Sequence, residues 1–263
     1  MSSHDVLNHL FYRTRASSVV RQRARPLVFD PFYLHLSRLK KTFKEAVGAA
    51  AITSVLDLGC GGRHYARLLG DRGIRYDGVD NLGEAEDIMK LDLEADFSLG
   101  TYDLVICSEV LEHIFHYPRL IDNMFRHVAP GGVVFVTVPF AYEVHGWAYH
   151  DYFRFTDQAL RRLFGRSGHV QIRPTNSYLS SVVQRINNLV FYVPVPFLLK
   201  IPVFLVLNLF MIGIQGATRA TLRVLRIGPD RPFHRLLYSY PLGYTCLVRP
   251  GSRGTTGGAD NHE

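Results

Sequence analysis

Apolar residues between 51 and 175 alternate between short continuous runs and longer segments with helical spacing. SVLDLG, TYDLVICS and VVFVTVPF are short apolar runs, which indicates strands buried in a parallel sheet. RHYARLLG and YPRLIDNMFRHVAPGG are predicted to be helices, the second ended by Pro130 and Gly131. Shorter strands are predicted at RYDGVD, DIMKLD, HVQIRP and GYTCLVRP. This alternation predicts an α/β fold with a doubly wound, mostly parallel sheet.

The segments on either side of this pattern differ from it in composition. Residues 31–50 predict an amphipathic helix, so residues 1–50 are interpreted as an N-terminal helical cover. Residues 51–250 are interpreted as the main domain. The polar, glycine-rich residues 251–263 are predicted to be disordered. Within the main domain, FTDQALRRLFGRSG predicts a helix with Thr156 as its N-cap.

An apolar stretch precedes the last predicted strand. Residues 189–214 contain three prolines and a single charged residue, Lys200. The stretch is long enough to span a bilayer, but prolines interrupt helices, and a span would separate the last strand from its sheet. We therefore predict an apolar and basic helical insertion over 186–228, with two short apolar segments hinged near Lys200 that dip into one leaflet or cover an apolar groove. The alternatives are a buried helical hairpin, a dimer seam and a transmembrane helix.

Charge is distributed unevenly along the chain, although the net charge is +7. Acidic residues predominate in 45–153, whereas 1–44 and 154–235 are basic. Basic flanks favour an anionic partner, and an ordinary solvated surface is the alternative. A basic stripe at helical spacing follows the apolar stretch and suits lipid phosphates, so peripheral membrane contact is predicted through 189–226. The stripe consists of Arg219, Arg223 and Arg226.

Cysteine spacing indicates neither disulfides nor a metal site. Cys60, Cys107 and Cys246 are far apart and form no CxxC motif, so reduced thiols in a cytosolic compartment are expected, and no metal is expected. The N-terminal residues lack the apolar core of a signal peptide. These features predict a cytoplasmic protein that is peripheral at the inner face of the cell membrane. The sequence leaves the oligomeric state open.

The turn VLDLGCGG follows the first strand, where open parallel sheets bind ligands. A dinucleotide fingerprint needs a third glycine where this chain has His64, and Asp57 would repel a pyrophosphate. An acid there favours a cationic ligand instead. Asp80 ends the second strand, where a carboxylate accepts from ribose hydroxyls, and Asp92 follows the third strand, where it accepts from an adenine amino group. The predicted ligand is an adenosine with a positive centre and no pyrophosphate, which S-adenosylmethionine fits.

With these residues in order, the chain resembles class I S-adenosylmethionine-dependent methyltransferases of the type 11-like group. VLDLGCGG matches the first motif of that family, YDGVD the second, DLVICSEVLEHI the fourth-strand segment and HVAPGGVVFVTVPF the fifth-strand region. VPFAYEVHGWAYHDYFRFT is similar to a bacterial subgroup associated with polysaccharide and cell-envelope biosynthesis. Many relatives have a glycine at the position of Arg63. The resemblance implies a Rossmann-like fold with strand order 3-2-1-4-5-7-6.

The resemblance also places Ser108 and Glu109, after the fourth strand, at the methionine end of the cofactor. The full set of expected cofactor-binding residues is Asp57, Gly59, Cys60, Gly61, Asp80, Asn81, Asp92, Leu93, Ser108 and Glu109. Each has a structural alternative: the glycines serve any tight turn, and the acids serve strand ends and solvated turns.

Methyl transfer to a hydroxyl needs alignment and removal of a proton. His145, then His113, then His150 are the candidate bases, because a histidine near neutral pKa suits this role. Alternatively His113 caps its helix or binds Glu112, His150 is a surface residue, or no base is used. Asp151 and Arg154 are interpreted as a pair that pins the loop, with Asp151 capping the next helix.

We therefore expect O-methylation of a glycan or lipid-linked saccharide at the membrane surface. One alternative is a methyltransferase for a quinone, a fatty acid or another small lipid, which would explain the apolar insertion equally well. A second is a membrane-associated binding protein that has the cofactor fold without turnover. Nucleic acid is a weaker partner, because no base-methylation motif or RNA-binding module is present. An oxidoreductase is disfavoured by the missing third glycine.

Overall fold

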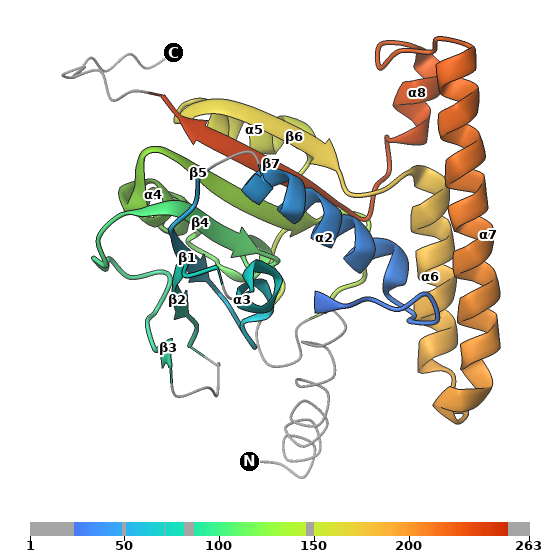
Figure 1. The fold of residues 1–263 in the computed structure, drawn as a ribbon, viewed down its shortest axis with the longest axis horizontal. Coiled ribbons are helices and arrows are strands. Elements are labelled where there is room, and N and C mark those ends of the chain that lie inside the picture. Colours follow the sequence, from blue (N-terminus) through green and yellow to red (C-terminus); the bar gives the residue numbers. More distant parts are fainter. Residues whose placement is uncertain (1–23, 49–50, 71, 82–86, 146–149, 252–263) are drawn as a thin grey trace.

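The central feature of the protein is a seven-stranded sheet with the strand order β3-β2-β1-β4-β5-β7-β6 (Figure 1). The computed structural model describes residues 24–48, 51–70, 72–81, 87–145 and 150–251. The strands are β1 (Ser54–Leu58), β2 (Arg75–Val79), β3 (Ile88–Met89), β4 (Tyr102–Ser108), β5 (Val128–Pro139), β6 (Gly168–Pro174) and β7 (Gly243–Pro250). Strand β7 lies antiparallel between β5 and β6, and the other neighbouring pairs are parallel. The predicted Rossmann-like fold and strand order are confirmed.

Helices cover both faces of the sheet. On one face, Phe43 of α2 (Tyr33–Gly48) and Tyr65 of α3 (His64–Leu69) pack on strands β1, β4 and β5. On the other face, α4 (Tyr117–His127) and α5 (Asp157–Gly165) contribute Leu120, Met124 and Leu160 to a second core. Both faces are buried, which explains why the central strands have continuous apolar sequences.

The start of α5 agrees in part with the prediction, and the end of α4 differs from it. The oxygen Oγ1 of Thr156 accepts a hydrogen bond from the amide of Ala159 at 3.1 Å, so Thr156 caps α5 as predicted. Asp151 does not cap that helix, because it lies outside the first turn and binds other groups. Helix α4 ends at His127, before Pro130 and Gly131, because β5 already begins at residue 128.

Three further helices stand beside the sheet, next to α2 (Figure 1). They are α6 (Tyr178–Tyr192), α7 (Phe197–Val224) and α8 (Pro232–Leu237), and α6 and α7 form a long antiparallel hairpin. The predicted hinge near Lys200 is wrong, because α7 is continuous through Pro202 and the chain turns at 193–196 instead. The sequence there alternates valine with Pro194 and Pro196, and a residue before proline avoids the helical conformation. Lys200 is buried and donates to the carbonyl of Phe191 at 2.6 Å, closing the turn.

The hairpin formed by α6 and α7 has an apolar outer side, and its inner side buries many polar residues together with Val183, Phe204 and Met211. Buried polar residues on its inner side are Ser180, Ser181, Gln184, Asn187, Asn188, Lys200 and Asn208. Exposed apolar residues include Leu179, Val182, Ile186, Leu189, Tyr192, Leu198, Leu199, Val206, Leu209 and Phe210. Among the described residues, α7 is the one helix that is long and apolar enough to cross a membrane, judged by length and composition. Within its most apolar 18-residue segment, 22 % is buried.

Polar residues of the inner side attach the hairpin to the domain. The Asn208 amide donates to the carbonyls of Val28 and Asp30 at 2.7 and 3.0 Å, in the segment before α2. The Asn188 amide donates to the Glu143 carboxylate at 3.0 and 3.1 Å, in the loop after β5. Residues 1–23 of the predicted N-terminal cover, and all of the predicted tail except Gly251, lie outside the described residues.

Candidate active site

The glycine loop lies where the carboxyl ends of β1, β2 and β4 meet. The amides of Gly59 and Cys60 both donate to the carbonyl of Val79, at 2.7 and 3.1 Å. The amide of Gly61 donates to the carboxylate oxygen Oδ2 of Asp80 at 2.8 Å. The loop and Asp80 therefore form one structure at the carboxyl ends of β1 and β2.

Gly59 and Gly61 are both in the left-handed region, with φ of 75° and 51°, where residues with a Cβ are strained. A Cβ on Gly59 would lie 2.3 Å from Cγ2 of Val110, whereas one on Gly61 would meet nothing within 4 Å. Gly59 thus allows close packing of β1 on the segment after β4, and Gly61 borders open space. Cys60 is buried beneath the loop, and burial with the nearby Asp57 raises the pKa of its thiol.

Arg63 also has a left-handed backbone, with φ of 57°. Its guanidinium forms an ion pair with Asp87 and lies 5.0 Å from the centroid of the Tyr76 ring. These contacts stabilise the arginine in a conformation that costs free energy. The turn therefore continues in the left-handed conformation at Arg63, after Gly59 and Gly61.

Asp57 is 1 % exposed, and the Tyr76 hydroxyl donates a hydrogen bond to its oxygen Oδ2. Burial, followed by the charge of Asp57, raises the pKa of Tyr76 far above its usual value, so the phenol keeps its proton and remains a donor. Tyr76 is not predicted as a site residue by the sequence, because tyrosine is common in strands such as RYDGV.

The remaining predicted adenosine contacts lie after β2 and β3. Asp80 is partly buried and Asn81 is exposed. Asp92 is exposed, and its oxygen Oδ1 accepts from the amide of Glu94 at 2.9 Å, closing a turn. Leu93 is buried in the core on the α4 side. The turn engages one oxygen of Asp92, and the expected contact of this carboxylate with adenine stays a prediction.

Ser108 and Glu109 belong to a chain of hydroxyl groups that crosses from α3 to β5. Thr137 donates to the Glu109 carboxylate at 2.8 Å, so Ser108 donates to Thr137 at 2.8 Å and Tyr65 donates to Ser108 at 2.7 Å. The backbone of Glu109 is left-handed, with φ of 56°, a strain that functional sites often contain. Tyr65 and Thr137 were not predicted as site residues.

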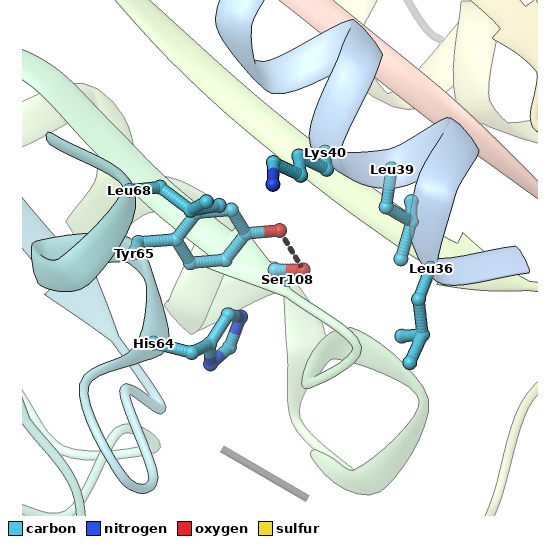
Figure 2. Close-up of a pocket in the computed structure, with 7 residues that line it drawn as sticks. All are labelled: Leu36, Leu39, Lys40, His64, Tyr65, Leu68 and Ser108. Carbon is cyan, nitrogen blue, oxygen red and sulfur yellow. Dashed lines mark hydrogen bonds between the residues drawn. The ribbon is translucent and has the colours of Figure 1, made fainter. Parts of the chain in front are cut away.

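A small pocket opens beside this chain, between α2, α3 and the end of β4. It is lined by Leu36, Leu39, Lys40, His64, Tyr65, Leu68 and Ser108. Figure 2 shows Lys40 and the Tyr65 hydroxyl directed toward Ser108, with the two α2 leucines on the opposite wall. The N-terminal helix therefore forms part of the site, although its sequence indicated only a cover.

Two of the three candidate bases lie together after β4 and β5. The ring centroids of His113 and His145 are 5.0 Å apart. His150 is exposed and its ring packs beside Tyr152, while its backbone carbonyl accepts from Nδ1 of His113 at 2.7 Å. The structure therefore brings His113 and His145 to one point, and His150 contributes through its main chain.

The loop that carries His145 is pinned by the predicted pair of Asp151 and Arg154. The guanidinium contacts both carboxylate oxygens, at 2.5 and 2.7 Å, and also donates to the carbonyl of Glu143 at 3.0 Å. Burial alone would raise the pKa of Asp151, but hydrogen bonds from Arg154 and from the amide of His145 outweigh it and hold this pKa at about 2. Asp151 is therefore ionised at neutral pH.

Glu112 was missed as a site residue, although the motif VLEHI contains it. Its side chain is fully buried, and neither carboxylate oxygen has a hydrogen-bond partner among the described residues. Burial, with the nearby charge of Glu109, raises its pKa well above the usual value. No sequence signal distinguishes such a residue from a solvated glutamate at the start of a helix.

The chain is similar in sequence to several known proteins. The curated relatives include proteins named ubiquinone biosynthesis O-methyltransferase. The one from Rickettsia conorii is 24 % identical over 147 residues, covering 51 % of this chain and 49 % of that protein. The one from Pseudomonas aeruginosa is 32 % identical over 125 residues, covering 41 % and 53 %. The chain thus spans about half the length of these curated relatives.

A solved structure and a family model show the fold and the family to which the chain is similar. The structure of StiE O-MT is similar in fold, with a TM-score of 0.53, 19 % identity, and coverage of 90 % of this chain and 81 % of that one. A family model described as a methyltransferase domain matches residues 21–179, more than half of the chain. With the predicted strand order and the glycine loop in place, the chain belongs to the methyltransferase domain family.

Proposed function

We propose that this protein transfers a methyl group from S-adenosylmethionine to an oxygen atom of a small apolar acceptor at a membrane surface. The glycine loop joined to Asp80 is the observation that supports cofactor binding. One carboxylate oxygen of Asp80 holds the loop through Gly61, and a carboxylate has enough lone pairs to accept from a ribose hydroxyl as well.

The chemical step is a displacement at carbon. The acceptor hydroxyl loses its proton, its oxygen forms a bond to the methyl carbon, and the bond from that carbon to sulfur breaks with its electron pair going to sulfur. The products are a methyl ether, S-adenosylhomocysteine and a proton. Because the sulfonium is already a good leaving group, the protein mainly supplies alignment and a place for the proton.

The acceptor class is proposed from the relatives and from the hairpin together. The relatives carry the name of ubiquinone biosynthesis O-methyltransferases, which favours a small quinone-like lipid over the glycan suggested by sequence resemblance. A lipid acceptor also explains why the hairpin of α6 and α7 adjoins the loop after β5, to which Asn188 ties it. The narrower resemblance to cell-envelope enzymes stays a prediction.

Membrane contact is proposed because the hairpin reverses the usual pattern of a water-exposed helix. A surface helix normally buries its apolar stripe and exposes polar residues, but here asparagines and serines are buried and leucines are exposed. The exposed arginines at 219, 223 and 226 follow this apolar face. Anionic lipids match both features, since the acyl region accepts the apolar face and phosphates accept the guanidinium groups.

Titration of the purified protein with S-adenosylmethionine tests the cofactor assignment. The wild type is expected to bind, and Asp80→Asn is expected to bind at least about tenfold more weakly, because one charged ribose acceptor is lost while Gly61 retains an acceptor. Isothermal titration calorimetry measures both. Asp96→Asn is the control, because Asp96 is exposed and pairs with Arg126 at the surface. Absence of binding by folded wild type would remove the enzyme proposal in favour of a binding protein without turnover.

Sedimentation with lipid vesicles tests the membrane proposal. The protein is expected to sediment with anionic vesicles at low salt and much less with neutral ones. A double variant, Leu198→Asp with Val206→Asp, is expected to stay in the supernatant, because it places two carboxylates on the exposed apolar face. Ser98→Asp with Thr101→Asp is the control, since it adds the same charge at exposed positions before β4. Equal sedimentation of both double variants would contradict the proposal.

A further inference from the structure

Glu112 is the residue whose surroundings the methyl transfer does not explain. It is 0 % exposed, and both of its carboxylate oxygens lack a hydrogen-bond partner within the described part of the chain. Burial of an unpaired carboxylate costs several kcal/mol, so such a group needs a proton or a cation. Two histidine rings approach the same oxygen of Glu112.

The Nδ1 atoms of both histidines already have hydrogen-bond acceptors beside them. Nδ1 of His113 lies 2.7 Å from the carbonyl oxygen of His150, which can only accept, so this nitrogen carries the proton. Nδ1 of His145 lies 3.1 Å from Oδ2 of Asp151 and 3.2 Å from the carbonyl oxygen of Glu143. Both contacts favour the tautomer protonated at Nδ1, which leaves a lone pair on each Nε2 nitrogen.

The two Nε2 lone pairs and the carboxylate converge on one point. Nε2 of His113 lies 3.4 Å from Oε1 of Glu112, and Nε2 of His145 lies 3.8 Å from the same atom. All three donor atoms lie within 4.8 Å of one another. A tetrahedral ion with bonds of about 2.0–2.1 Å holds its ligand atoms roughly 3.3 Å apart, so a small inward movement completes the geometry.

The charges near this point also favour a cation. Glu109 and Asp151 add negative charge beside Glu112, and Arg154 is the cation that acts on it in the described structure. Arg154 is already bound to both oxygens of Asp151. Hydrogen bonds from Nδ1 to a carbonyl or a carboxylate are the arrangement that orients histidines bound to metals.

We propose that Glu112, His113 and His145 bind a divalent transition-metal ion of the zinc type. Two imidazoles and one carboxylate suit zinc and leave a fourth position open, as in catalytic zinc sites. No spacing pattern in the sequence predicts this site, because the first two ligands are adjacent and the third comes from the loop after β5. In this arrangement His145 is a metal ligand and not the proton acceptor.

A role for the ion in methyl transfer rests on the proposed function. An acceptor hydroxyl in the open position would have a lowered pKa, because the ion stabilises the oxygen anion after its proton passes to water. The oxygen then attacks the methyl carbon of the sulfonium as described above. The site lies directly after Ser108 and Glu109, on the side of β4 where the methionine end of the cofactor is expected.

Metal content of the purified full-length protein tests the site without relying on activity. The chain is stripped with a chelator, dialysed against micromolar Zn²⁺, and analysed by inductively coupled plasma mass spectrometry. One ion per chain is expected, with at least a tenfold loss of affinity in Glu112→Gln and His145→Ala. His116→Ala is the matched control and is expected to keep the ion, because its ring pairs with Glu94 at the surface. Wild type without bound zinc, or variants that bind like wild type, would overturn the proposal.

Cobalt substitution gives a second measurement that does not depend on the folding of any variant. Co²⁺ in the wild-type site is expected to show the intense visible absorption of a tetrahedral ion, and only the weak spectrum of the hydrated ion would overturn the site. Titration with S-adenosylmethionine after chelation separates this inference from the proposed function, since the two bind to different residues. Methyl transfer that survives complete chelation would overturn the catalytic role of the ion.

Discussion

Replacing Arg154 with alanine is expected to lower the free energy of unfolding at neutral pH by about 3–5 kcal/mol, because it leaves the buried Asp151 carboxylate without its cation. The side chain of Asp151 is 1 % exposed and holds the loop that carries His145. Urea unfolding of both proteins followed by circular dichroism measures the difference. Arg126→Ala is the control, and its pair with Asp96 is so exposed that a loss below about 1 kcal/mol is expected.

The same variant is expected to show a specific pH dependence. The folded pKa of Asp151 is about 2, below the value of about 3.9 in an unfolded chain, so ionisation stabilises the fold. This contribution is fully present above about pH 4 and is lost as the pH falls toward 2. The difference between wild type and Arg154→Ala should therefore shrink across that window. A constant difference would show that the stabilisation does not come from the charge on Asp151.

Replacing Gly59 with alanine is expected to destabilise the protein by about 2–5 kcal/mol and to abolish cofactor binding. Two costs add: a left-handed backbone with φ of 75°, and a Cβ that would lie 2.3 Å from Cγ2 of Val110. The loop must shift to relieve this contact, which moves the amide of Gly61 away from Asp80. Urea unfolding measures the first effect, and titration with S-adenosylmethionine measures the second.

Gly61→Ala separates the cost of the left-handed backbone from the cost of the clash with Val110. Gly61 has the same left-handed backbone, but an added Cβ would meet nothing within 4 Å, so only about 1–2 kcal/mol should be lost. Combining Gly59→Ala with Val110→Ala should recover part of the lost stability, because the smaller side chain removes the clash. Equal losses in the two single variants, without recovery in the double variant, would show that packing against Val110 does not limit the loop.

The strands were predictable from the sequence because burial on both faces of the sheet produces continuous apolar runs. Residues 54–58 and 102–108 are nearly all buried, and apolar residues make up most of both strands although Asp57 and Asp103 lie within them. The glycine loop was predictable for a similar reason, since positive φ angles restrict the residue type. Local rules are less reliable at α7, where prolines predict a break, but Pro202 lies only one turn and a half into a helix that continues.

The contacts made by polar site residues were much harder to predict. The partner of Asp57 is Tyr76 on the neighbouring strand, and its position depends on the register between β1 and β2. Glu112 and His145 are far apart in the sequence and meet only because β4 and β5 are neighbours. The pair of Asp151 and Arg154 was predicted and is confirmed, because both residues belong to one short loop.

The position of β7 has a consequence for synthesis of the protein. This strand lies between β5 and β6 in the sheet, but the hairpin of α6 and α7 comes before it in the chain. While a ribosome makes the chain, β5 keeps an unpaired edge and β6 has no neighbour until residues 243–250 emerge. The apolar outer side of the hairpin is then already outside the ribosome. The nascent chain is therefore most prone to aggregate in this interval, when chaperones or a nearby bilayer would protect it most.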